Sequence, residues 1–132
     1  MSNYTEERQM LRNSFKYHKL EKSYITTVLV QFVFDYDFIE ILKGFLNEYL
    51  LRRDTIGVVY SDEFEVGDEG YFGENKVLFY YGIDDDWYDI VTYDELCNYL
   101  QVACDFFIER NKEKAEEANK YLIQIKEKYG VE

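Results

Sequence analysis

Carboxylates and aromatic rings are the side chains best suited to chemistry in this chain of 132 residues, and they are concentrated in its middle. Residues 54–105 contain 14 Asp and Glu but a single basic residue, Lys76. Ten aromatic residues lie between Tyr60 and Tyr93. Because carboxylates pair with Arg and Lys, and aromatic rings stack on guanidinium groups, this composition is typical of a surface that binds a cationic protein. The alternative is an acidic face that contacts only solvent.

The residue sets that most enzyme mechanisms need are missing from the sequence. The one histidine, His18, lies in a basic stretch with no catalytic constellation around it, and neither common Gly-rich phosphate-binding motif occurs. No pair of carboxylates is singled out for glycoside hydrolysis. We therefore predict a protein that is not an enzyme and has no cofactor. A small acidic enzyme is a further alternative.

Calcium binding has a partial sequence match. Asp62 and Gly67 fit positions 1 and 6 of an EF-hand loop, but Phe64, Val66 and Gly73 stand where three ligands are required. The consecutive side chains of Asp84–Asp86 diverge along the chain. We therefore predict no metal site.

Cys97 and Cys104 are the only cysteines. They lie seven residues apart on a predicted helix, so their Cα atoms stand about 10 Å apart, too far for a disulfide. We predict two buried, reduced thiols.

Composition limits the class of protein. With 47% hydrophobic and 19% aromatic residues, the chain can form a core, which argues against intrinsic disorder. A net charge of −12 disfavours direct binding to nucleic acid or to an anionic membrane. The longest uncharged stretch, Ser23–Phe34, is shorter than the ~20 residues that span a bilayer, and residues 1–11 show no signal peptide. We expect a soluble, cytoplasmic protein with one domain over residues 1–132.

The first half of the chain is predicted to be mostly helical. Residues 1–22 are read as a loose arm or a weakly amphipathic helix that docks through Met10, Leu11 and Phe15. The β-branched and aromatic residues of Ile25–Phe34 favour a strand, with a buried helical segment as the alternative. Asp37 and Glu40 resemble a capping box, and the apolar spacing after them predicts a helix over Phe38–Leu51.

Three short strands follow, over Thr55–Tyr60, Lys76–Tyr81 and Trp87–Val91. They are joined by turns rich in Gly and Asp, which favour an antiparallel meander. About half of their aromatic rings are expected to face the core, and the others to lie on the outer face or at the turns.

Two helices end the chain. Thr92 and Glu95 form a capping box for a helix that reaches about Arg110, and a second helix covers 112–129, where Gly130 ends it. The predicted class is α+β: a small antiparallel sheet with helices packed on it, an N-terminal helical region and two C-terminal helices.

Three segments carry a resemblance to a known family. DFIEILKGFL, GVVY with the acidic loop and aromatic strand after it, and DIVTYDELCNYLQVACDFFIERN resemble bacterial contact-dependent growth inhibition immunity proteins, especially those that act against ribonuclease toxins. The resemblance runs from about Phe38 to the C-terminus. It implies a protein that binds and neutralises a cognate toxin in the cytoplasm of the cell that makes it.

The predicted partner is thus a basic toxin domain, with a nuclease, especially an RNase, favoured. Its binding would use carboxylates for attraction and aromatic side chains as anchors. The alternative is an acidic adaptor or nucleic-acid mimic that regulates an endogenous basic protein. The predicted partner-binding residues are Asp62, Glu63, Glu65, Asp68, Glu69, Tyr71, Asp84, Asp85, Asp86, Trp87 and Tyr88.

Overall fold

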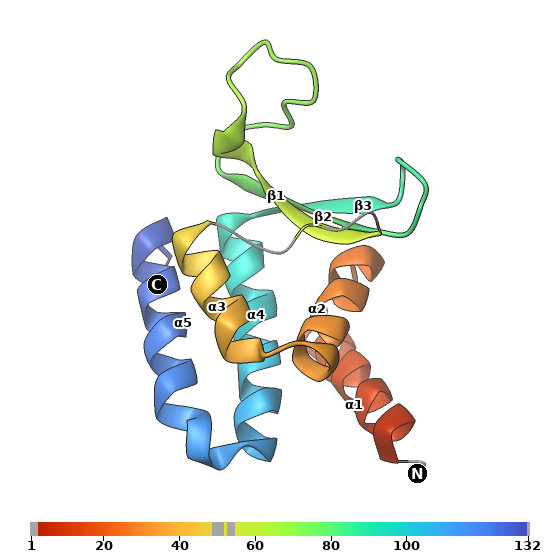
Figure 1. Cartoon of the computed structure of the whole chain (residues 1–132), viewed down its shortest axis with the longest axis vertical. Helices are drawn as coiled ribbons and strands as arrows, with labels where there is room; N and C mark the ends of the chain where they lie inside the picture. The colour runs from red at the N-terminus through yellow and green to blue at the C-terminus, as the bar shows by residue number, and fades with distance from the viewer. Residues whose placement is uncertain (1–2, 49–51, 53–54, 132) are drawn as a thin grey trace.

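The computed structural model describes residues 3–48, 52 and 55–131. A three-stranded sheet lies across one end of a group of helices, and a long loop projects away from them (Figure 1). The elements in chain order are α1 (Asn3–Tyr17), α2 (Ser23–Asp35), α3 (Phe38–Asn47), β1 (Ile56–Tyr60), the 3₁₀ turn η1 (Ser61–Glu63), β2 (Lys76–Tyr81), β3 (Tyr88–Thr92), α4 (Tyr93–Arg110), the 3₁₀ turn η2 (Lys112–Lys114) and α5 (Ala115–Tyr129).

The sheet is an antiparallel meander in the order β1-β2-β3, which confirms the predicted α+β class. Successive side chains of each strand point alternately to the inner and the outer face of the sheet. Val58, Val77, Phe79 and Val91 are buried on the inner face. This face packs on α2 and α4, so the helices cover one side of the sheet.

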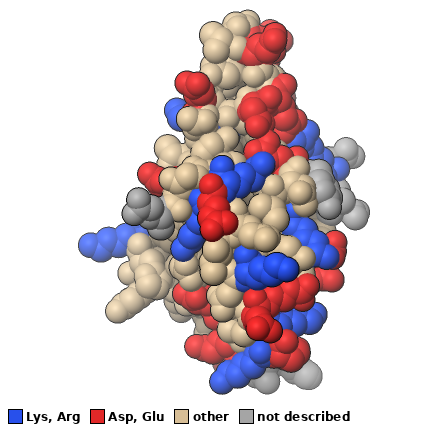
Figure 2. All heavy atoms as spheres, turned by 90° about the vertical axis from the view of Figure 1, so that its left-hand side faces the viewer, with Lys and Arg blue, Asp and Glu red and all other residues tan. Residues whose placement is uncertain are grey.

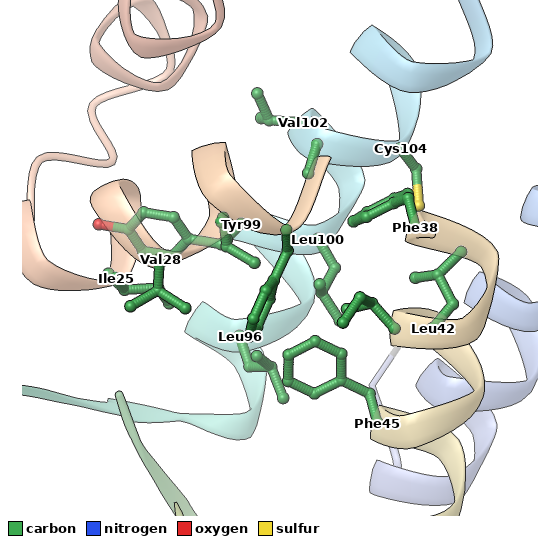
Figure 3. Close-up of a cluster of buried hydrophobic side chains, with 14 of the residues drawn as sticks. Ile25, Val28, Phe38, Leu42, Phe45, Leu96, Tyr99, Leu100, Val102 and Cys104 are labelled. Atoms are coloured by element: carbon green, nitrogen blue, oxygen red, sulfur yellow. The ribbon is translucent and has the colours of Figure 1, made fainter. Parts of the chain in front are cut away.

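Below the sheet, the core is formed by side chains from α2, α3 and α4. Phe38, Leu42 and Phe45 of α3 lie beside Leu96 and Leu100 of α4 (Figure 3). Cys104 lies in the same cluster, and both cysteines are buried and unbonded, as predicted. Their burial raises the pKa of Cys97 to about 11 and that of Cys104 to about 12, which keeps both thiols protonated and unreactive at neutral pH.

The segment Ile25–Phe34 is helical, so the strand favoured by residue propensity is wrong and the helical alternative is right. Ile25, Val28, Leu29 and Phe32 recur at helical spacing, and each is fully buried. Burial of that stripe between the sheet and the other helices outweighs the weak preference of β-branched residues for strands.

Helix α1 is packed on the rest of the protein rather than being a loose arm. Leu11 and Phe15 are fully buried, as their predicted docking role requires, whereas Met10 is 47% exposed. The Arg8 guanidinium contacts the Asp35 carboxylate of α2 at 2.5 Å.

Helix ends follow the predicted capping signals. The Asp37 carboxylate accepts hydrogen bonds from the backbone N–H of Ile39 and Glu40, and Thr92 and Glu95 form the reciprocal box that begins α4. Helix α3 ends at Asn47, before the predicted end at Leu51, because Glu48 adopts a left-handed conformation with φ 58°. The predicted continuation over 49–51 lies outside the described residues.

Basic side chains lie along both edges of the sheet. Arg52 Nε donates to the Val58 carbonyl oxygen of β1 at 2.8 Å, and Lys22 Nζ donates to the Ile90 carbonyl oxygen of β3 at 2.9 Å. Arg52 also pairs with Glu63, and Lys22 pairs with Glu95.

Candidate functional site

The outer face of the sheet forms a hollow of about 580 Å³. Leu78 and Tyr80 of β2 and Tyr88 and Ile90 of β3 lie on this face because they alternate with the buried inner residues. The long loop after η1 contributes Gly70, Tyr71 and Phe72 to one wall of the hollow, and the β2–β3 turn contributes Gly82, Ile83, Asp84 and Asp85 to another.

Two glycines allow aromatic rings to approach the backbone closely beside this hollow. A Cβ atom at Gly57 would lie 2.4 Å from the Tyr80 hydroxyl oxygen, so the Tyr80 ring covers β1 at a point without a side chain. Gly82 has φ +102°, and a Cβ atom there would lie 2.2 Å from a ring carbon of Trp87. The positions of Tyr80 and Trp87 therefore depend on glycine at 57 and 82.

The acids of η1 and of the long loop differ in their surroundings. The Glu63 carboxylate is held by contacts within the protein, because it pairs with Arg52 and accepts a hydrogen bond from the backbone N–H of Tyr60 at 2.7 Å. The Asp68 carboxylate accepts from the Glu65 backbone N–H at 2.8 Å and shapes the loop. Together with Glu69, the residues Glu65 and Asp68 are exposed.

The β2–β3 turn presents its acids outward. Asp84 Oδ1 accepts from the Asp86 backbone N–H at 2.8 Å, which fixes the turn and leaves Asp85 and Asp86 exposed. Next to them, Trp87 is 43% exposed and Tyr88 is 40% exposed. Large aromatic side chains with this exposure beside carboxylates are common anchors at protein interfaces.

The structure brings only part of the predicted site together. Tyr71, Asp84, Asp85 and Tyr88 surround the hollow, whereas the two acidic turns begin at opposite ends of the sheet (Figure 1). Among the other predicted acids, Asp62 of η1 and Glu65 of the long loop line a second hollow of about 640 Å³ that Tyr71 also borders. Sequence reasoning missed Tyr80 and Phe72 as lining residues of the first hollow.

Two segments, the β1–β2 connection (residues 61–75) and the β2–β3 turn (residues 82–87), are the acidic turns of this protein. Most of their acids have no basic partner. Eight of them form no ion pair with any Lys or Arg in the described part of the chain. Figure 2 shows the contrast on one face, where Lys and Arg mix with Asp and Glu over the helices, and acids predominate toward the projecting loop. These eight acids are Asp62, Glu65, Asp68, Glu69, Glu74, Asp84, Asp85 and Asp86.

Two carboxyl groups, those of Glu48 after α3 and Asp62 on η1, interact near the base of the long loop. Burial, and then the hydrogen bond and charge of Asp62, raise the pKa of Glu48. Tyr129 acts against this shift through its hydroxyl, which donates to Glu48 Oε2 at 3.2 Å, and Lys128 Nζ lies 3.9 Å from the same oxygen. The neighbouring Tyr60 hydroxyl is buried and lies 3.5 Å from the Gly44 carbonyl oxygen.

We expect Glu48→Gln to flatten the dependence of stability on pH. A carboxyl with a raised pKa in the folded state contributes its full stability below the pKa of the unfolded state, about 4.3, and loses it as pH rises through the raised pKa. Gln stays neutral and can still bond to Asp62. Thermal melts from about pH 4 to about pH 8 should show the variant gaining stability over wild type as pH rises.

Glu40→Gln is the matched control, because Glu40 lies on α3, the helix that Glu48 follows, with an exposed side chain paired to Lys43. Parallel pH profiles for wild type and Glu48→Gln would show that the Glu48 proton does not contribute to folding.

No group of three His, Cys, Asp or Glu side chains in the described ranges is placed to hold a metal ion. His18 packs edge-on against the Tyr17 ring at 5.2 Å. Within the same ranges, no helix combines the length and hydropathy needed to cross a membrane.

An acidic α+β protein with exposed aromatic side chains has the features of a protein that acts by binding another protein. The family model described as CDI immunity protein matches residues 18–122, which is most of the chain. The chain belongs to this family of contact-dependent growth inhibition immunity proteins, so it is an immunity protein that neutralises a toxin. No curated protein and no solved structure gave a significant match. The family match begins after α1, although α1 contributes Leu11 and Phe15 to the core.

Proposed function

We propose that this immunity protein neutralises a nuclease toxin, specifically a ribonuclease, by docking its two acidic turns and the outer face of its sheet on the basic surface of the toxin. The observation that carries the proposal concerns eight exposed acids of the two acidic turns, which make no ion pair with a Lys or Arg among the described residues. Two of them, Asp84 and Asp85, line the aromatic hollow. Nucleases bind a phosphate backbone through Lys and Arg. A surface rich in carboxylates matches such a cleft in charge and can occupy it in place of the nucleic acid.

The residues have two roles in this proposal. The exposed acids, among them Asp68, Glu69 and Asp84–Asp86, attract the toxin over a distance and orient its approach. Tyr71, Trp87 and Tyr88 supply the contact area that determines how long the complex lasts. Neither role needs a catalytic residue. The protein would act in the cytoplasm of the cell that makes the toxin.

The test is co-expression with the toxic domain encoded by the neighbouring reading frame. We expect the two proteins to co-purify, growth to be rescued, and degradation of RNA by the purified toxin domain to stop when this protein is added. DNA is the control substrate. Rescue with a toxin that degrades neither RNA nor DNA would contradict the nuclease assignment. Absence of rescue, with capture of an endogenous basic protein instead, would favour the adaptor alternative.

A further inference from the structure

We propose that the hollow on the outer face of the sheet is a socket for one arginine side chain of the toxin. This inference rests on the proposed function and specifies it, because it names the chemical group that the hollow receives. It makes the hollow, rather than the loops alone, the place where a single residue of the partner is recognised.

The lining of the hollow matches a guanidinium group better than an ammonium group. Tyr71, Tyr80 and Tyr88 contribute aromatic rings to the lining, and Asp84 and Asp85 contribute carboxylates. A guanidinium is planar, so it can stack on a ring while its edge donates two hydrogen bonds to a carboxylate. An ammonium is a strongly hydrated point charge that can do only one of these well.

The charge and polarity of the hollow favour a cation. No Lys or Arg of the described residues lines it, and neither Asp84 nor Asp85 pairs with one. Leu78 and Ile90 form an apolar part of the floor. A cation held there loses water, which strengthens its attraction to rings and carboxylates.

The rim of the hollow offers an apolar contact for the chain that carries the arginine. Ile83 lines the hollow and is 85% exposed, directly before the acids of the turn. The aliphatic stem of an arginine that enters over this rim can pack on Ile83 while its guanidinium reaches the rings.

The first test uses a small probe and does not depend on the toxin. Trp87 is the only tryptophan, and its ring packs on Gly82, which lines the hollow. Titration with N-acetyl-arginine amide should give a saturable change in Trp87 fluorescence and in the NMR signals of Tyr71 and Tyr88. N-acetyl-lysine amide should bind more weakly and the neutral citrulline analogue not at all. Equal responses to all three probes, or no saturable response to the arginine probe, would overturn the socket.

The second test uses the complex with the toxin. Tyr88→Leu keeps an apolar side chain but removes the ring, and it should weaken toxin binding about tenfold. Tyr88→Phe should retain affinity. Tyr17→Leu is the control, because Tyr17 is an exposed aromatic residue on α1, 83% exposed. Replacing toxin arginines by lysine one at a time should reveal one arginine whose effect disappears in the Tyr88→Leu background.

The two proposals fail in different ways. If Tyr88→Leu binds toxin as well as Tyr17→Leu does, while neutralising the acidic turns still weakens binding, the arginine socket is wrong and the docking surface stands. If neither change affects binding to a toxin that the wild-type protein neutralises, both the socket and the docking surface are wrong.

Discussion

We expect that neutralising acids in both turns slows association with the toxin by about ten- to a hundredfold at low salt. The variant combines Asp68→Asn, Asp84→Asn, Asp85→Asn and Asp86→Asn. Asn keeps the shape of Asp and can still accept the turn hydrogen bonds made by Asp68 and Asp84. The variant therefore removes charge while the loops keep their conformation, and the dissociation rate should change much less than the association rate.

Stopped-flow measurements of Trp87 fluorescence at several salt concentrations would measure this effect. In the wild-type protein the association rate should fall steeply as salt screens the charges, and in the variant this dependence should be shallower. The control neutralises an equal number of exposed acids away from the sheet, on η2 and α5: Glu113, Glu116, Glu117 and Glu127. If both variants slowed association equally, only the net charge would matter and the turns would have no special role.

The second large effect is expected for Asp89→Ala, which should lower the free energy of unfolding by about 2 kcal/mol. Asp89 lies on the inner face of β3, where its Oδ2 accepts from the backbone N–H of Tyr24 at 2.7 Å and of Ile25 at 3.1 Å. Helix α2 has no acidic residue in its first turn, and Lys22 makes no side-chain cap. Asp89 therefore supplies both the missing acceptor and a negative charge at the positive end of the helix.

Urea denaturation followed by circular dichroism would measure the loss. Asp94→Ala is the matched control, because Asp94 is an exposed acid in the first turn of α4 and should cost only a few tenths of a kcal/mol. We expect Asp89→Asn to fall between wild type and Asp89→Ala, since an amide still accepts one hydrogen bond. A loss for Asp89→Ala no larger than the control's would show that the cap does not support α2.

Sequence reasoning succeeded where the structural signal is local. The capping residues Asp37 and Thr92 lie next to the helices they begin, and Gly and Asp turns separate the strands. It failed for α2 because strand propensity is a local quantity, whereas the packing that decides between helix and strand comes from distant elements. The cap that begins this helix, Asp89, lies 65 residues beyond Tyr24 in the chain.

The candidate site was predictable in composition but not in arrangement. The acids and aromatic residues lie within one segment of the sequence, yet a meander places its successive turns at opposite ends of the sheet. Tyr80 could not be assigned to the outer surface from its own neighbours, because the space it occupies is set by Gly57 on another strand. Such pairings depend on strand register, which alternation alone does not fix.

The Arg and Lys side chains along the sheet edges affect whether this sheet can pair with strands of other molecules. A strand added beside β1 or β3 would have to displace Arg52 from the Val58 carbonyl or Lys22 from the Ile90 carbonyl. The same two side chains are also held by ion pairs, Arg52 with Glu63 and Lys22 with Glu95. The addition of strands from other molecules is therefore disfavoured at both edges, which protects a small sheet from fibril-like self-assembly.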